Sequence, residues 1–298
     1  MSKIITISND ILEVNISTLG AEMISVKKSG KDIMWCGDEK FFKVYSPILF
    51  PYCSSLKDNT AIFEGKTYKN LPKHGFAMGM EFSVVSQEKS SVCMLLSDSE
   101  YTKNIYPYSF NLKVLFKLNG EKLGVYYIVE NKGNNPMPFN VGSHETYAVD
   151  GSIENYFLEF SNDYDFIEST CIKDKLLDSE KFKVKLQSNL LPLEYKYFHT
   201  TENFEKDTLK NGSLIFENIK SKRVSLIKNQ TGEVKASVYF NDFNHLVIWT
   251  MANAPFIAIE AWSGLPDMYN SKGKIEDKKS IEFIKSGESK MFYHSIEF

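Results

Sequence analysis

The chain has 298 residues, of which 43% are hydrophobic and 24% charged, and its formal net charge is −3. A chain of this length can bury a large core, and the mild negative charge, without a basic patch interleaved with aromatic residues, argues against nucleic-acid binding. No apolar run approaches the roughly 18 residues that suggest a membrane-spanning helix, so a membrane is not an expected partner either.

The start of the chain predicts a cytoplasmic protein. Residues 1–10 are too few and too polar for a secretory signal. The four cysteines, Cys36, Cys53, Cys93 and Cys171, are widely separated and form no Cys-x-x-Cys pair, so neither a zinc cluster nor a dithiol redox site is indicated. No linker or internal repeat marks a boundary, and we expect one domain spanning residues 1–298.

Alternation of apolar and polar residues dominates the rest of the chain. It predicts strands over residues 12–17, 110–118, 123–129 and 234–240, and residues 245–250 form a more fully apolar strand. Asn119-Gly120 is expected to provide the two left-handed residues of a hairpin turn between the second and third of these strands. Helix signals are limited to short stretches near Glu100–Tyr106 and Glu202–Leu209. Many closely spaced strands with few helices predict an all-β sandwich.

Three segments carry residues suited to chemistry. Lys73-His74-Gly75-Phe76 and Gly142-Ser-His144-Glu145 each place a histidine near a glycine and an aromatic residue, a setting typical of backbone that approaches a ligand closely. The third segment, 255–267, places Glu260 at the end of an apolar run and beside Trp262. Apolar surroundings raise the pKa of a glutamate towards the range useful for proton transfer.

The order of these motifs resembles the aldose 1-epimerase, or galactose mutarotase-like, family, in particular its shorter bacterial branch. The resemblance extends over most of the chain and includes Pro47–Pro51, Asn131–Gly142, Leu214–Phe216 and the terminal Gly287-Glu288. It implies the large two-sheet antiparallel "supersandwich" of mutarotases. It also implies a cofactor-free enzyme that interconverts the α and β anomers of a small-molecule sugar, as a monomer or homodimer.

The resemblance assigns roles to three residues. Glu260 would be the base on the C1 hydroxyl, His144 the acid at the ring oxygen, and His74 a second donor that orients the sugar. Each positioned acid or base contributes roughly 10²–10⁴-fold to such a reaction. We expect the histidines to titrate near their ordinary pKa of about 6.5 and so to serve both directions of a reversible reaction. His199, His245 and His294 match no motif and are expected to be structural or surface residues.

Residues that would contact the substrate are also suggested by the resemblance. They are Ser55, Lys57, Met78, Asp207 and Trp262. Trp262 could equally form a wall of the core, and the segment around Asp207 could equally be a solvated charged turn. Ser55 and Met78 stand where many relatives carry arginine, and His144-Glu145 stands where they carry His-Pro. Arg223 is the only arginine in the chain. Because bidentate phosphate recognition usually uses arginine, a free sugar is favoured over a hexose 6-phosphate, with Lys57 and Lys73 keeping the second substrate open.

Two alternatives differ in kind from an epimerase. The loss of the expected arginines suggests a non-catalytic sugar-binding protein on the same fold, although such a protein would have no need of the acid and base. The two histidines and the glutamate could instead form a metal triad, but no His-x-His or His-Glu-x-x-His spacing supports one, so no metal is expected.

Overall fold

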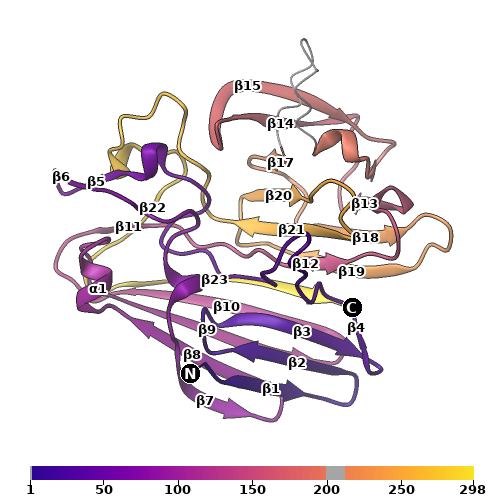
Figure 1. The fold of residues 1–298 in the computed structure, drawn as a ribbon, viewed down its shortest axis with the longest axis horizontal. Helices are drawn as coiled ribbons and strands as arrows, with labels where there is room; N and C mark the ends of the chain where they lie inside the picture. Colours follow the sequence, from indigo (N-terminus) through magenta and orange to yellow (C-terminus); the bar gives the residue numbers. More distant parts are fainter. Residues whose placement is uncertain (1, 199–211) are drawn as a thin grey trace.

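The computed structural model describes residues 2–198 and 212–298, and these are built mainly from antiparallel strands (Figure 1). The all-β fold expected from the sequence is confirmed. The largest sheet has nine strands. In sheet order these are β16 (Leu190–Pro192), β13 (Tyr156–Phe160), β18 (Arg223–Lys228), β19 (Val234–Tyr239), β23 (Ser289–Glu297), β10 (Lys122–Asn131), β9 (Phe110–Asn119), β8 (Ser91–Ser97) and β7 (Ser83–Glu88).

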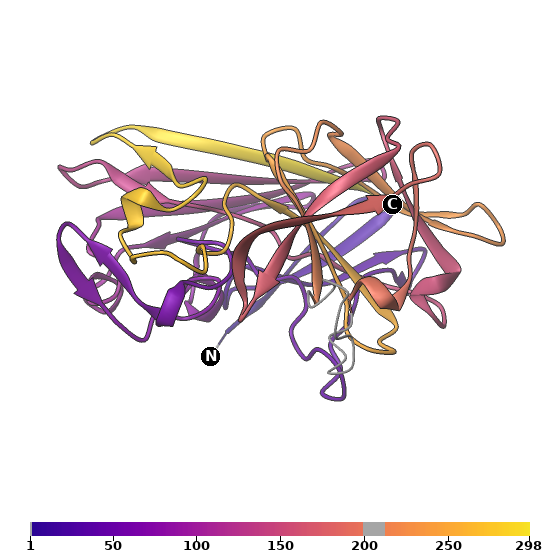
Figure 2. The same cartoon turned by 90° about the horizontal axis from the view of Figure 1, so that it is seen from above.

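Two four-stranded sheets accompany it. One contains β1 (Ile4–Ser8), β2 (Leu12–Ser17), β3 (Glu22–Lys28) and β4 (Lys31–Asp32); the other, in order, β12 (Thr146–Ala148), β21 (Phe256–Trp262), β20 (His245–Trp249) and β17 (Ser213–Phe216). Three strand pairs complete the set: β5 (Ala61–Phe63) with β6 (Lys66–Tyr68), β11 (Met137–Phe139) with β22 (Glu282–Ile284), and β14 (Phe166–Lys173) with β15 (Leu176–Lys185). Figure 2 shows the yellow β23 and the indigo N-terminal strands in different layers.

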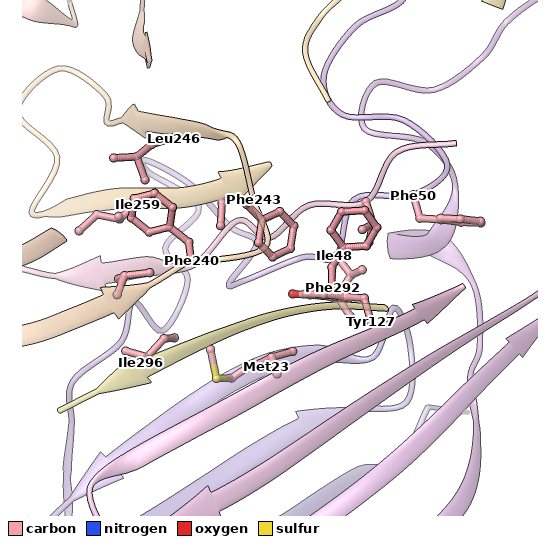
Figure 3. Close-up of a cluster of buried hydrophobic side chains, with 14 of the residues drawn as sticks. Met23, Ile48, Phe50, Tyr127, Phe240, Phe243, Leu246, Ile259, Phe292 and Ile296 are labelled. Carbon is pink, nitrogen blue, oxygen red and sulfur yellow. The ribbon is translucent and has the colours of Figure 1, made fainter. Parts of the chain in front are cut away.

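The main core lies between these layers. Tyr127 on β10, Phe292 on β23, Leu246 on β20, Ile259 on β21 and Met23 on β3 belong to one buried cluster (Figure 3). All five side chains are almost completely buried. Side chains on the opposite face of β21 do not belong to this core.

The long hairpin is confirmed, but its turn lies one residue later than expected. Asn119 is the last strand residue and pairs with Lys122, so the loop is Gly120-Glu121. Gly120 has a φ of 59°, whereas Asn119 remains in the strand. The register that brings Leu118 opposite Leu123 on the buried face determines this position.

Helical structure is limited to single turns within the described ranges. They are α1 (Glu100–Lys103) and the 3₁₀ turns η1 (Lys57–Asn59), η2 (Ala77–Gly79), η3 (Ile153–Asn155), η4 (Tyr195–Tyr197) and η5 (Ile275–Asp277). The helix expected over Glu100–Tyr106 is shorter because Tyr106 turns into the core and its hydroxyl donates to the Pro138 carbonyl at 2.7 Å. The helix expected at Glu202–Leu209 lies outside the described residues. In the part of the chain that the structure describes, no helix is long and apolar enough to cross a membrane.

Candidate active site

Glu260 lies within β21 rather than at its end, and it is only 2% exposed. Alternation along the strand separates two faces. Ile257, Ile259 and Ala261 belong to the main core, whereas Glu260 shares the other face with Phe256 and Trp262. This second face forms the floor of the candidate site.

His144 lies directly opposite Glu260 across an antiparallel pairing. Residues 142–146 run beside β21, with Gly142 opposite Trp262 and Thr146 opposite Ala258. This register places the two side chains on the same face, with Nε2 of His144 at 3.6 Å from Oε2 of Glu260. The separation exceeds a normal hydrogen bond but permits strong electrostatic coupling. The pairing of residues 142–146 with β21 therefore brings the proposed acid and base together.

The glycines of the site serve packing between chain segments. A Cβ atom on Gly142 would lie 2.8 Å from Cδ1 of Trp262 and 3.0 Å from the sulfur of Cys53. Gly75 has a φ of +75°, and its Cβ would lie 2.1 Å from the Phe50 carbonyl oxygen. Close packing between chain segments therefore requires both glycines, and their approach to a ligand stays a prediction.

Aromatic rings fix the orientation of the His144 imidazole. Phe42 stacks on it with a centroid distance of 5.4 Å and an interplanar angle of 18°, and Trp249 meets it edge-on at 5.6 Å. Both aromatic residues are partly exposed. The His74 ring also meets the His144 ring edge-on, at a centroid distance of 5.6 Å. Phe42 and Trp249 had no recognisable signal in the sequence, because their proximity to His144 depends on the tertiary fold.

His74 is held in a strained backbone conformation by Ser54. Both residues have positive φ angles, 66° and 64°. The Ser54 amide donates to Nδ1 of His74 at 3.1 Å, and the His74 amide donates to the Ser54 carbonyl at 2.8 Å. Because Nδ1 accepts a hydrogen bond, a neutral imidazole carries its proton on Nε2. His74 is therefore prepared as a hydrogen-bond donor, and strain of this kind is common at functional sites.

Burial shifts the proton affinities of all three groups. It raises the pKa of Glu260 well above its ordinary value, despite the opposing positive charge of Lys73. It lowers the pKa of His144 to about 4 and that of His74 well below 6.5. The expectation that the histidines titrate near 6.5 is therefore wrong, since neither imidazolium is adequately solvated. In the free protein at neutral pH, both imidazoles are neutral.

Lys73 supplies a positive charge close to the acid/base pair. Its charge lowers the pKa of Glu260, His74 and His144. The residue as a whole is exposed, but desolvation of its ammonium lowers its own pKa, which the charge of Lys175 lowers further. Lys73 and Lys175 are thus near one another beside the site.

The predicted substrate-binding residues differ in their burial and in the residues that they contact. Trp262 is 3% exposed; its indole N–H donates to the Ser143 carbonyl at 3.0 Å, and its ring meets His74 edge-on at 5.8 Å. Ser55 is buried and accepts from the Asp267 amide through its carbonyl at 2.9 Å. Lys57 is half-buried, and its ammonium lies 5.9 Å from the Tyr269 ring centroid.

Met78 and Asp207 complete that set. Met78 is half-buried in η2, and its backbone packs against Gly20. Asp207, like His199, lies outside the described residues. No hydrogen bond or ion pair among residues 2–198 and 212–298 joins Ser55, Lys57 or Met78 to Glu260, His144 or His74. Their contact with substrate stays a prediction.

A second buried imidazole–carboxylate pair lies behind the site. His245 and His294 are both buried, and Nε2 of His294 lies 2.8 Å from Oε1 of Glu145. Sequence reasoning missed this pairing, because His294 lies 149 positions from Glu145. In the described part of the chain, no group of three His, Cys, Asp or Glu side chains is arranged to hold a metal ion.

Comparisons with known proteins show what the chain is similar to. The sequence profile of the family described as Aldose 1-epimerase matches residues 3–292. The chain is also 30% identical over 294 residues to the plasmid-encoded protein LacX of Lactococcus lactis subsp. lactis, with 93% of each chain covered.

Solved structures show the same fold. A galactose mutarotase related enzyme from Lactobacillus acidophilus superposes with a TM-score of 0.90 at 27% identity, covering 99% of this chain and 97% of that one. A galactose mutarotase-like protein from Lactobacillus casei gives a TM-score of 0.90 at 25% identity, covering 99% of both chains. With a family profile that matches nearly its whole length, the chain belongs to the aldose 1-epimerase family.

Proposed function

We propose that this protein is a cofactor-free aldose 1-epimerase that opens and recloses the ring of a free aldose. The observation that supports this most directly is the opposition of His144 and Glu260, at 3.6 Å, on the floor of the site. Family membership supports an isomerase of the mutarotase type. The roles of individual residues and the choice of sugar are part of the proposal.

Anomer interconversion requires two coordinated proton transfers. The C1 hydroxyl loses its proton to Glu260 while the ring oxygen gains one from His144, and the C1–O5 bond breaks to leave an open-chain aldehyde. Rotation about C1–C2 and the reverse transfers then give the other anomer. The sugar loses one proton to Glu260 and gains one from His144, so its composition and oxidation state do not change.

The proton affinities of Glu260 and His144 correspond to the open-chain stage. Burial favours a protonated Glu260 and a neutral His144, which is the state reached after ring opening. A ring-closed sugar needs the proton on His144 instead. The C1 hydroxyl donating to Glu260 and the ring oxygen accepting from His144 would stabilise that charged form. The raised pKa of Glu260 makes it a stronger base once it is ionised.

His74 would steady the developing charge. Its Nδ1 is occupied by the Ser54 amide, so its Nε2–H is the group available to a sugar oxygen. A neutral donor is suitable because it orients the substrate without competing for the transferred proton. The half-buried rings of Phe42 and Trp249 offer apolar faces of the kind that sugar C–H groups pack on.

One observation favours a phosphorylated sugar as a second candidate substrate. Desolvation lowers the pKa of Lys73, and the charge of Lys175 lowers it further; an anionic ligand would stabilise both ammonium groups. The absence of an arginine near the site removes the bidentate partner that phosphates usually find in proteins. We therefore place the free aldose first.

Exchange spectroscopy by NMR can test both substrates. The rate of α/β exchange is measured for a panel of free aldoses and their 6-phosphates, with and without protein, at one ionic strength because lysine–phosphate attraction is screened by salt. We expect faster exchange for at least one free aldose and a higher kcat/KM than for its 6-phosphate. Saturable sugar binding without faster exchange would instead identify a non-catalytic sugar-binding protein.

A further inference from the structure

The segment that carries His144 is joined to the opposite sheet by a buried pair. Glu145 follows His144 in the chain, so its side chain leaves from the other face of the segment, away from the site. Its Oε1 meets Nε2 of His294, on β23 of the nine-stranded sheet, at 2.8 Å. The two side chains are 5% and 0% exposed. This contact therefore crosses the core between the two layers.

The same segment is fastened to β21 on both sides of Glu260. The Ile259 amide donates to the Glu145 carbonyl at 3.0 Å. The Ala261 amide donates to the Ser143 hydroxyl at 3.1 Å, and the Ser143 amide donates to the Ala261 carbonyl at 3.0 Å. Glu145 thus participates in the bonds that hold His144 opposite Glu260.

We propose that Glu145 and His294 form a positioning pair for the acid and base, holding residues 143–145 in register with β21 and placing a fixed negative charge behind both. The proposal rests on the proposed epimerase function. A buried ion pair is a poor source of stability, because desolvation of two charges offsets most of their attraction. Apolar residues could fill the same space without this desolvation cost, so stability does not explain the pair. A role in setting the geometry and charge of the site does.

The electrostatics of the site agree with this role. Burial raises the pKa of the Glu145 carboxyl, but the charge and the hydrogen bond of His294 act in the opposite direction, and the net pKa lies below the ordinary value. Glu145 is therefore ionised at neutral pH. Its charge raises the pKa of both Glu260 and His144. Lys73 acts on the same two groups with the opposite sign.

Other titratable groups around Glu145 stay neutral near pH 7. Tyr127 on β10 and Tyr147 on β12 both have a pKa raised well above 10 by burial, with Glu145 adding to the shift. Burial raises the pKa of the Cys53 thiol to about 12. Tyr127 stacks on the His294 ring at a centroid distance of 5.7 Å. The charges that change the proton affinity of Glu260 are thus Lys73 on one side and Glu145 on the other.

Glu145→Gln tests the proposal because it removes the charge and preserves the shape. The titration of the Glu260 carboxyl is followed by carbon-13 NMR, and its signal is assigned by its loss in Glu260→Gln. We expect the pKa of Glu260 to fall by at least about half a unit, since a nearby like charge has been removed. We also expect kcat to fall by about tenfold with KM within about twofold, because the geometry of reacting groups changes while the sugar contacts do not.

Two variants provide controls. Glu145→Asp retains the charge and should keep the wild-type titration. Ser225→Ala breaks another buried polar pair, Ser225–Ser237 at 2.8 Å in the nine-stranded sheet, and should leave both the titration and kcat unchanged. If Glu145→Gln does not fold, Glu145→Gln/His294→Gln takes its place, because it replaces both members of the buried pair by neutral amides.

The titration separates this proposal from the epimerase proposal. A folded Glu145→Gln variant, or the double variant, in which Glu260 titrates as in the wild type would overturn the positioning role. If the wild type accelerates no anomer exchange, the proposed function fails, yet the NMR titration still decides whether Glu145 acts on Glu260. A lower pKa in Glu145→Gln that is restored in Glu145→Asp supports the proposal in either case.

Discussion

Replacing Glu260 by glutamine should remove activity and increase stability at neutral pH. The carboxyl is 2% exposed, and its Oε2 has no hydrogen-bond partner within the described residues. Burial raises its folded-state pKa well above 4.5. Below pH 4.5 both folded and unfolded states are protonated, and the wild type has its full stability. As the pH rises towards the folded-state pKa, only the unfolded state ionises, and stability is lost at about 1.4 kcal/mol for each pH unit.

Glutamine cannot ionise, so the variant escapes this loss. We expect it to match the wild type near pH 4 in denaturant unfolding, and to become more stable than the wild type as the pH rises to 7. The rate of anomer exchange should fall at least about 10²-fold, because the amide cannot accept the C1 hydroxyl proton. Near-wild-type turnover would remove Glu260 from the mechanism. A stability difference that is constant from pH 4 to pH 7 would show that the carboxyl is not held neutral by burial.

Three further predictions address substrate, packing and metal. Lys73→Ala should weaken any activity on a 6-phosphate much more than Lys57→Ala does, because Lys73 is close enough for its charge to lower the pKa of Glu260, whereas the Lys57 ammonium lies over the Tyr269 ring. Equal effects of the two variants in kinetic assays would contradict this placement. Gly264→Ala should destabilise the protein by about 1–3 kcal/mol in denaturant unfolding, because the new Cβ would lie 2.1 Å from Cγ of the buried Asn140. Gly79→Ala is the control, since a Cβ on Gly79 would have no atom within 4 Å. Activity should survive prolonged chelation, because the proposed steps are proton transfers between side chains and sugar; loss of activity that one added metal restores would favour a metal triad.

Local patterns in the sequence predicted the strands well. The alternation over residues 110–129 specified the buried face of the long hairpin, and the apolar run before Glu260 specified a buried strand. These predictions succeeded because the period of a strand is a local property. The turn residue was misplaced by one, since the register of the pairing decides which residues form the loop.

The chemistry of the site depends on contacts between distant segments and was only partly predictable. The family resemblance assigned roles to Glu260, His144 and His74, which the fold brings close together, but their proton affinities follow from burial that no single segment reveals. The stacking of Phe42 on His144 joins residues about a hundred positions apart. The Glu145–His294 pair was missed for the same reason, although the unusual glutamate after His144 was the one available signal.

A double-mutant cycle on kcat/KM for anomer exchange tests most directly whether His144 and Glu260 act as one acid/base pair. The wild type, His144→Gln, Glu260→Gln and the double variant are compared with the same aldose at the same pH. Because both groups serve a single proton-transfer sequence, we predict that each single variant loses at least about 10²-fold and that the double variant loses little more than either one. Losses that simply multiply in the double variant, or a single variant that retains wild-type kcat/KM, would contradict the proposed mechanism.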